Sequence, residues 1–164
     1  DKGINLPETY IELPALSAKD LADLEFAAIN ADVISLSFVN CAEDVELIQR
    51  HLKRLGSSAG LVLKIETQSG FEQLPQILLT AMRSANFGVM IARGDLAIEC
   101  GFERLAEVQE EILWLCEAAH VPVIWATQVL ESLAKKASLA RRNQRCGDGR
   151  SRRVCDAEKR SARC

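Results

Sequence analysis

The chain has 164 residues, of which 48% are hydrophobic, so it is long enough to bury the core of one domain. Its formal net charge of -3 and sequence pI of about 5.5 provide no overall basic field, which argues against a nucleic-acid partner. No apolar run approaches the roughly 20 residues that a membrane-spanning helix needs, and the chain opens without a signal peptide. We therefore expect a cytoplasmic protein with no membrane or nucleic-acid partner.

Helices and strands are predicted to alternate along the chain from Ser17 onward. Ser17 has the character of an N-cap, and Asp20 three positions later completes a capping-box pattern. Apolar spacing predicts strands at 33–38, 61–66, 87–92 and 121–126, and helices at 17–28, 45–56, 74–81, 105–119 and 130–136. The strands are near-continuous apolar runs joined by short links. This pattern predicts the α/β class, with a parallel sheet and helical crossovers.

Polar side chains gather at one end of the predicted strands. They lie at or just past the carboxyl ends, and they are Lys64, Glu66, Arg93, Asp95, Thr127 and Gln128. A closed barrel and a doubly wound sheet both fit the alternation of elements. The placement of these residues favours a barrel, whose sites are built at that edge.

A lysine and two carboxylates dominate this predicted edge. Lys64 and Glu66 are two positions apart on a strand and therefore share one face. Asp95 adds a second carboxylate, and two carboxylates with water and substrate oxygens are a usual way to hold Mg²⁺. If a helical turn follows Gly94 and Asp95, its free N–H groups would bind an anion. Thr127 would contribute a hydroxyl from a third strand end.

Each of these features also has a purely structural interpretation. Lys64 and Glu66 could form a plain ion pair on an edge strand, and the run 93–95 could be a simple turn. Together, at the ends of separate strands, they are harder to explain by structure alone. The cysteines indicate no zinc site because no CxxC pair occurs; those at 41, 100 and 116 are expected to be buried free thiols.

Several stretches resemble pyruvate kinase. They are residues 62–66 with Gly70, 89–99 and 122–132, together with 2–7, 19–24 and 37–45 upstream. The resemblance runs in order over residues 2–136. Trp125 stands where a cysteine is common, and Cys100-Gly101 departs from the usual sequence, which is the kind of variation expected of an atypical bacterial form.

The resemblance implies a fold and an activity. The fold would be a partial TIM (β/α)8 barrel, from the fourth to the seventh strand. The activity would be glycolytic transfer of a phosphoryl group from phosphoenolpyruvate to ADP, giving pyruvate and ATP. Glu66 and Asp95 would be ligands of Mg²⁺ or Mn²⁺, and Lys64 would neutralise the transferring phosphoryl group and the enolate. The N–H groups around Gly94 and Asp95, with Thr127 nearby, would hold the substrate carboxylate.

The family also has parts that have no counterpart in this sequence. By this resemblance, we expect this sequence to lack the first three barrel strands, the lid domain, the residues that bind K⁺ and help to bind ADP, and the regulatory C-terminal domain. We therefore expect the chain to be a fragment of the catalytic barrel that is inactive alone and does not form the homotetramer usual in the family. The alternatives are an enolate-forming aldolase or lyase of the same barrel superfamily, and a non-catalytic remnant.

Residues 137–164 depart from the family pattern. They contain eight arginines and three cysteines, where the family predicts a Gly-x-Pro-x-Arg-Ala-Glu run, a helix and a strand. If the third base of each codon is chosen freely, shifting the reading frame of the tail by one base gives a run, a helix and a strand of the kind that the family has. We interpret residues 1–136 as the partial barrel domain and 137–164 as a frameshifted, unstructured and non-native basic tail. The alternative of a nucleic-acid-binding tail is disfavoured because the tail has no aromatic residue for base stacking.

Overall fold

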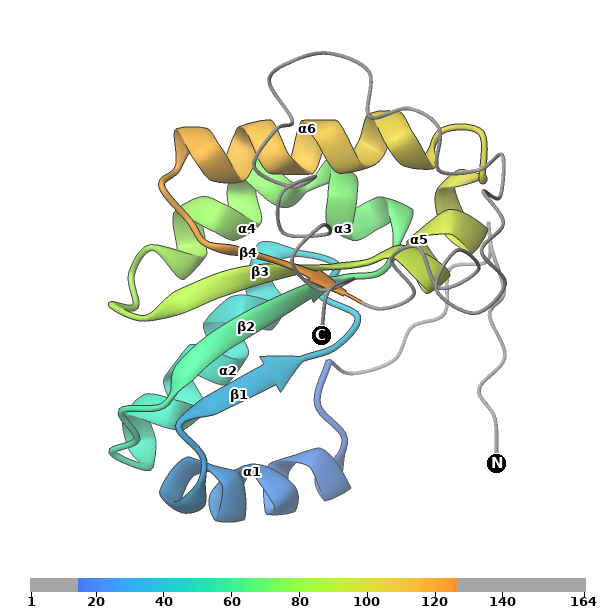
Figure 1. Cartoon of the computed structure of the whole chain (residues 1–164). Helices are drawn as coiled ribbons and strands as arrows, with labels where there is room; N and C mark the ends of the chain where they lie inside the picture. The colour runs from blue at the N-terminus through green and yellow to red at the C-terminus, as the bar shows by residue number, and fades with distance from the viewer. Residues whose placement is uncertain (1–14, 127–164) are drawn as a thin grey trace, which may run out of the picture. The chain divides into compact units, whose positions relative to one another are not determined.

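The computed structural model describes residues 15–126 (Figure 1). The chain divides into two compact units, Asp1–Trp125 and Ala126–Cys164. All helices and strands described below lie in the first unit, apart from the final residue of the last strand. The helix expected from residue 130, Thr127, Gln128 and the tail from 137 lie outside the described residues.

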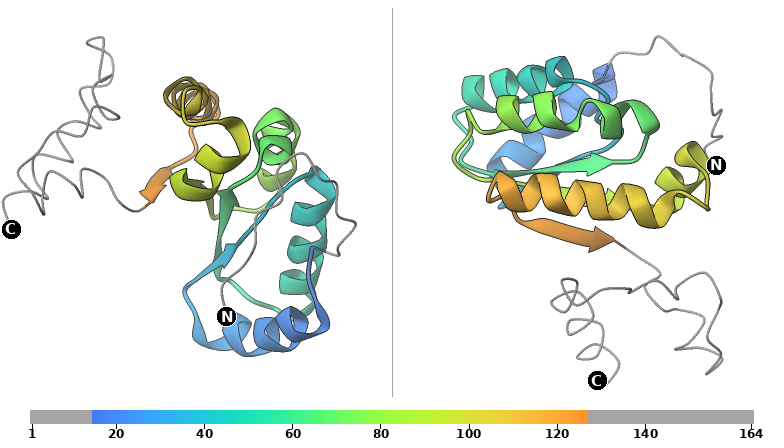
Figure 2. Two further views of the ribbon diagram at one scale, coloured as in Figure 1. Left: turned by 90° about the vertical axis from the view of Figure 1, so that its right-hand side faces the viewer. Right: turned by 90° about the horizontal axis from the view of Figure 1, so that it is seen from above.

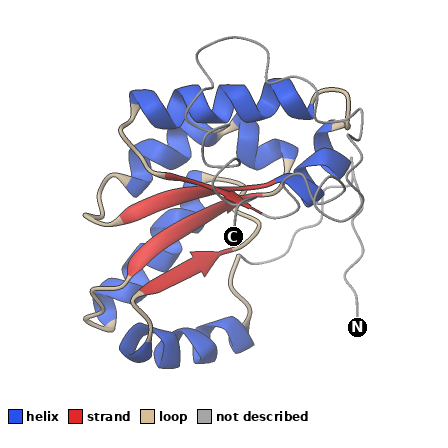
Figure 3. Ribbon diagram, in the orientation of Figure 1, coloured by secondary structure: helices blue, strands red, loops and turns tan. Residues whose placement is uncertain are grey.

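The predicted helices and strands of the described range are present (Figure 3). Two additional helices, Gln68–Glu72 and Arg93–Cys100, follow the second and third strands. The helices are α1 (Ala18–Asn30), α2 (Ala42–Arg54), α3 (Gln68–Glu72), α4 (Leu74–Ala81), α5 (Arg93–Cys100) and α6 (Leu105–Ala118). The strands are β1 (Val33–Leu36), β2 (Gly60–Ile65), β3 (Phe87–Ala92) and β4 (Val123–Ala126). The predicted α/β class is therefore confirmed.

Two of the strand boundaries that differ from the prediction have a local reason. The first strand ends at Leu36 because Phe38 has a φ of 53°, which is incompatible with extended backbone. The last strand begins at Val123 because the N–H of Val121 bonds back to Cys116 at the end of α6. The turn interpretation of 93–95 is wrong, since these residues form the first turn of α5.

The Ser17 cap forms as the sequence predicts. The hydroxyl of Ser17 accepts from the N–H of Asp20 at 3.2 Å, and the Asp20 carboxylate accepts from the N–H of Ser17 at 2.8 Å. The Ser17 hydroxyl also donates to the Asp20 carboxylate at 2.6 Å, and this hydrogen bond first, followed by that of the Ser17 N–H, lowers the pKa of Asp20 below its ordinary value. The reciprocal pair satisfies two N–H groups that the helix itself leaves open, and so sets the start of α1.

The sheet has the order β1-β2-β3-β4. Strands β1 and β2 pair in parallel, with Leu36 opposite Leu63, and β2 pairs in parallel with β3, with Ile65 opposite Ile91. Strand β2 is therefore an interior strand, so the suggestion that Lys64 and Glu66 lie on an edge strand is wrong. The N–H of Val89 bonds to the carbonyl oxygen of Pro122 at 3.0 Å, which joins β3 to the entry of β4.

One face of the sheet carries the core. The residues Leu63, Ile65, Val89 and Ile91 are completely buried, and they belong to one cluster with apolar residues of α2, α4 and α6. These helices lie along the same side of the strands (Figure 2). The alternation along β2 sends Lys64 to the opposite face, which in a barrel would be the interior.

The three cysteines within residues 15–126 are free thiols, as expected, but one of them is less buried than expected. Cys100 and Cys116 are buried, whereas Cys41 is only half-buried at the start of α2. Burial raises the pKa of the Cys116 thiol to about 11, which keeps it protonated and unreactive at neutral pH. No helix in the described range combines the length and the apolar character needed to span a membrane.

Helix α3 depends on a close backbone approach at Gly70. A Cβ atom added there would overlap the carbonyl oxygen of Val39, which is itself completely buried. The N–H of Gly70 also donates to the Thr67 hydroxyl at 3.1 Å, which caps the helix. Only glycine fits this contact between α3 and the link from β1 to α2.

We expect Gly70→Ala to destabilise the chain by about 1–3 kcal/mol, the range typical of overpacking at a close contact. The matched control is Gly94→Ala, because an added Cβ at Gly94 meets nothing within 4 Å. That change should be neutral or stabilising by less than about 1 kcal/mol. Urea denaturation followed by circular dichroism measures both, and equal effects of the two substitutions would contradict the close contact.

Candidate functional site

The carboxyl end of β2 carries a lysine and a buried glutamate in direct contact. The ammonium of Lys64 lies 2.8 Å from Oε1 of Glu66 and also donates to the hydroxyl of Ser37 at 3.0 Å. The Lys64 side chain is 25% exposed and the Glu66 side chain 3% exposed. The prediction that the two side chains share a face is confirmed. The partly exposed ammonium of Lys64 is paired with the buried carboxylate of Glu66.

The second oxygen of Glu66 fixes the loop that follows β1. Oε2 accepts from the backbone N–H of Phe38 at 2.6 Å, and Phe38 has the left-handed backbone conformation, with a φ of 53°. A left-handed conformation is uncommon for a bulky residue and persists where the surroundings impose it. The carboxylate therefore holds both the lysine of its own strand and a strained residue of the neighbouring loop.

A second set of hydrogen bonds joins the same two segments one step further along. The Thr67 hydroxyl donates to the side-chain oxygen of Asn40, and the Ser69 hydroxyl donates to the backbone oxygen of Asn40 at 3.3 Å. Ser37 and Asn40 are not among the site residues predicted from the sequence. For Ser37 a signal existed, because a polar residue just past the end of β1 matches the placement of Lys64 on β2.

Helix α5 begins directly at the end of β3. Its N-cap is Ala92, so Arg93, Gly94 and Asp95 form the first turn, where the backbone N–H groups have no partner within the helix. Gly94 is exposed and Asp95 is half-buried. The helical turn on which the predicted anion binding depends is therefore present. It begins at Arg93 and not after Gly94 and Asp95 as expected.

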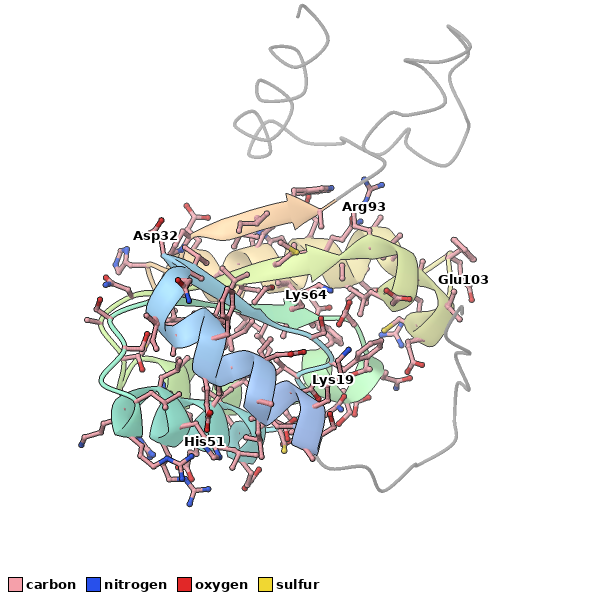
Figure 4. The ribbon with its side chains drawn as sticks, turned by 90° about the horizontal axis from the view of Figure 1, so that it is seen from below. Lys19, Asp32, His51, Lys64, Arg93 and Glu103 are labelled. Carbon is pink, nitrogen blue, oxygen red and sulfur yellow. The ribbon has the colours of Figure 1, made fainter. Side chains whose placement is uncertain are left out.

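The first residue of α5 contacts β4. The guanidinium carbon of Arg93 lies 5.6 Å from the centre of the Trp125 ring, within the range of a cation–π contact. Figure 4 shows the side chains with Arg93 and Lys64 labelled. The tryptophan that departs from the pyruvate kinase pattern thus packs on an arginine that precedes Gly94 and Asp95.

The structure brings some of the expected site residues together. Lys64 and Glu66 are in contact, and Gly94 and Asp95 follow the neighbouring strand, at the same edge of the parallel sheet. Thr127 lies outside the described residues. Within the range 15–126, no three His, Cys, Asp or Glu side chains come together as a metal-binding group.

Such an edge can hold an anion against a cation. It offers an ammonium, the open N–H groups of a helix start and two carboxylates from adjacent strand ends. A helix amino terminus attracts negative charge through its dipole and its free donors. The arrangement therefore suits an anionic substrate whose charge must be neutralised.

Several known proteins are similar to this chain in sequence. The family model described as "Pyruvate kinase, barrel domain" matches residues 1–145. Pyruvate kinase 2 of Saccharomyces cerevisiae is 41% identical over 133 residues, which are 80% of this chain and 25% of that relative. Pyruvate kinase PKLR of Rattus norvegicus is 40% identical over 137 residues, which are 83% of this chain and 23% of that relative. The chain spans about a quarter of the length of these curated relatives.

The family match confirms the resemblance and the partial barrel. A parallel sheet with helices along one side is the arrangement that part of a (β/α)8 barrel has.

We expect Glu66→Gln to destabilise the chain by about 1–3 kcal/mol, because the buried amide would lose two charge-assisted hydrogen bonds. Glu107→Gln is the matched control, since Glu107 pairs with Arg104 at 3.9 Å on the exposed surface of α6. An exposed pair contributes only about 0–1 kcal/mol. Urea denaturation measures the free energy of unfolding of both variants. If Glu66→Gln lowers it no more than Glu107→Gln does, the contacts of Glu66 with Lys64 and Phe38 do not stabilise the chain.

Proposed function

Because the chain belongs to the pyruvate kinase family, we propose that it carries the phosphoryl-transfer site of a pyruvate kinase. The reaction would transfer a phosphoryl group from phosphoenolpyruvate to ADP, giving pyruvate and ATP. The observation that carries the proposal is the Lys64–Glu66 pair, 2.8 Å apart, at the sheet edge where α5 begins. The names of the relatives support this activity over an enolate-forming aldolase or lyase.

Lys64 is proposed as the catalytic cation. Its ammonium would neutralise the charge of the transferring phosphoryl group and of the enolate that remains. Phosphoryl transfer depends mostly on positioning and charge neutralisation, so a fixed cation is effective. The contacts to Glu66 at 2.8 Å and Ser37 at 3.0 Å support a fixed position for this charge.

The start of α5 is proposed to bind the carboxylate of phosphoenolpyruvate. The N–H groups of Gly94 and Asp95 belong to the first turn and are not used by the helix. The open space around Gly94, where an added Cβ would meet nothing within 4 Å, supports approach of a ligand to the backbone. Thr127, which follows β4 in the sequence, is proposed as a further substrate-binding and catalytic hydroxyl.

Glu66 and Asp95 are proposed as the protein's ligands for Mg²⁺ or Mn²⁺. Carboxylate oxygens suit these hard cations, and with only two such residues the remaining ligands would be water and substrate oxygens. Each oxygen of Glu66 accepts one hydrogen bond, to Lys64 or Phe38, and keeps a further lone pair. The metal, when bound, would supply positive charge next to the phosphoryl oxygens. We assign no K⁺ ligand to this chain.

The proposal can be tested in a complete barrel. Residues 2–136 would replace the matching segment of pyruvate kinase 2 of Saccharomyces cerevisiae, and ATP formation from phosphoenolpyruvate and ADP would be assayed with Mg²⁺. We expect an active chimera in which Lys64→Met, Asp95→Asn or Thr127→Val each lowers kcat by about a hundredfold or more, as losses of charge-stabilising groups do. Glu107→Gln, on the far surface of α6, should change kcat less than about twofold.

A second measurement separates a poorly assembled chimera from a wrong assignment. Mn²⁺ would be titrated into the 164-residue chain with phosphoenolpyruvate present, and free Mn²⁺ followed by electron paramagnetic resonance. Binding should weaken in Glu66→Gln and Asp95→Asn but not in Glu107→Gln. Equal Mn²⁺ affinity in all these variants would contradict the proposed ligands.

We also propose that the barrel sequence ends near residue 136 and that residues 137–164 are read in a shifted frame. The family model matches to residue 145, which is nine residues past this boundary. The observation that supports the proposal is the composition of the tail, with eight arginines in 28 positions. Sequencing the gene through this region should reveal a single-base change that restores a family-like helix and strand. A gene in which no such change restores that pattern would refute the proposal.

A further inference from the structure

A cavity opens at the end of the sheet opposite to Lys64 and Glu66. Its volume is about 730 Å³, within the range of sites for small organic ligands. It lies between the last turns of α2 and the two links that lead into β2 and β3. Figure 4 shows His51 of α2 and Asp32 at the end of the molecule away from Arg93, which marks this side. Leu61 of β2 lines the cavity, and Lys64 lies three residues further along the strand, which is about 10 Å at 3.3 Å per residue.

The cavity is positively charged although the whole chain is negative. Three cationic side chains line it, Arg50, Lys53 and Arg83, against one carboxylate, Glu46. Arg83 lies 2.6 Å from Oε1 of Glu46, so this pair is neutral and leaves Arg50 and Lys53 in excess. The full chain has a net charge of -3, so the local excess of two positive charges is a feature of this site.

Arg50 and Lys53 both have N–H donors that are available to a ligand. Within residues 15–126 the ammonium of Lys53 has no hydrogen-bond or ion-pair partner. Arg50 uses only its Nε, at 3.4 Å from the backbone oxygen of Glu46. The amide of Asn86 lines the same cavity and likewise has no side-chain hydrogen bond in the described part of the chain. Charged and neutral donors therefore face the same space.

The walls of the cavity are held in place by hydrogen bonds. Gln49 of α2 donates to the backbone oxygens of Thr80 and Ala81, each at 3.3 Å, and so joins α2 to α4. The hydroxyl of Ser57 donates to the backbone oxygen of Ala28 at 2.8 Å, which fixes the link between α2 and β2. These hydrogen bonds fix the backbone around the cavity, which lowers the ordering cost of binding, while the side chains of Arg50 and Lys53 are exposed.

The dipole of α2 explains only part of this charge. Basic residues in the last turn of a helix interact favourably with its dipole, which accounts for Lys53. It does not account for Arg83 and Asn86, which come from the separate link between α4 and β3. Apolar side chains complete the cavity, since Leu52 and Leu61 line it and are 8% and 2% exposed.

We propose that this cavity binds a small organic phosphate. The phosphoryl group contacts Arg50 and Lys53, because guanidinium and ammonium groups form strong charge-assisted hydrogen bonds to phosphate oxygens. The organic part lies against Leu52 and Leu61, since the volume of about 730 Å³ greatly exceeds that of inorganic phosphate. The site is separate from the proposed catalytic residues, and its existence does not depend on the proposed reaction.

The test is a titration of the ¹⁵N-labelled full chain followed by nuclear magnetic resonance. The probes are inorganic phosphate, phenyl phosphate and phenol, and the readout is the shift of the backbone amides of Ser58 and Asn86. Phenyl phosphate should bind at least about fivefold more tightly than inorganic phosphate, because its ring buries apolar area. Phenol should cause no saturable shift at the same concentrations.

Variants identify the residues responsible. Arg50→Gln and Lys53→Gln should each weaken phenyl phosphate binding by about tenfold, and Glu46→Gln should strengthen it by removing the opposing charge. Lys19→Gln is the matched control, because it changes the net charge equally but lies at the start of α1, away from the cavity (Figure 4). The spectra themselves report whether each variant is folded.

The expected pattern distinguishes the site from general surface charge. The proposal is overturned if Lys19→Gln weakens binding as much as Arg50→Gln, or if the Ser58 and Asn86 amides do not shift. It is also overturned if phenyl phosphate binds no better than inorganic phosphate or if phenol binds as well. None of these outcomes bears on the proposed catalytic site, because the readout is binding at the other end of the sheet.

Discussion

The carboxylate of Glu66 is buried at the end of an interior strand, and it connects the parts that form the candidate site. Its two oxygens accept from the Lys64 ammonium at 2.8 Å and from the Phe38 N–H at 2.6 Å. A buried carboxylate without such partners would be strongly destabilising, so these contacts are what make its position possible. The link from β1 to α2 and the end of β2 are therefore held together by one side chain.

Packing next to this contact leaves little freedom to the same two segments. Val39 follows Phe38 and is completely buried, and its carbonyl oxygen touches the backbone at Gly70. The hydrogen bonds of Thr67 and Ser69 to Asn40 continue this contact along the start of α3. The ammonium of Lys64 therefore lies next to two segments that are joined by several hydrogen bonds and by close backbone packing.

The two ends of the parallel sheet have different chemistry. At the carboxyl ends of the strands lie a paired lysine, two carboxylates and the open N–H groups of α5. At the amino ends lies a cavity in which cationic side chains exceed anionic ones. The length of the strands keeps these two groups of charged side chains apart, so each edge can bind a ligand of its own.

The sequence by itself determined the four strands and the helices α1, α2, α4 and α6, since apolar spacing and the Ser17 cap are local signals. It did not predict α3, and it predicted α5 only as a conditional helical turn. It also determined that Lys64 and Glu66 share a face, because strand alternation requires it. Only the tertiary structure decided that β2 is interior, that Glu66 holds Phe38 in a left-handed conformation and that Arg93 packs on Trp125. The cavity at the amino ends also appeared only there. These features join residues distant in the chain, and local patterns of hydrophobicity contain no information about which distant segments meet.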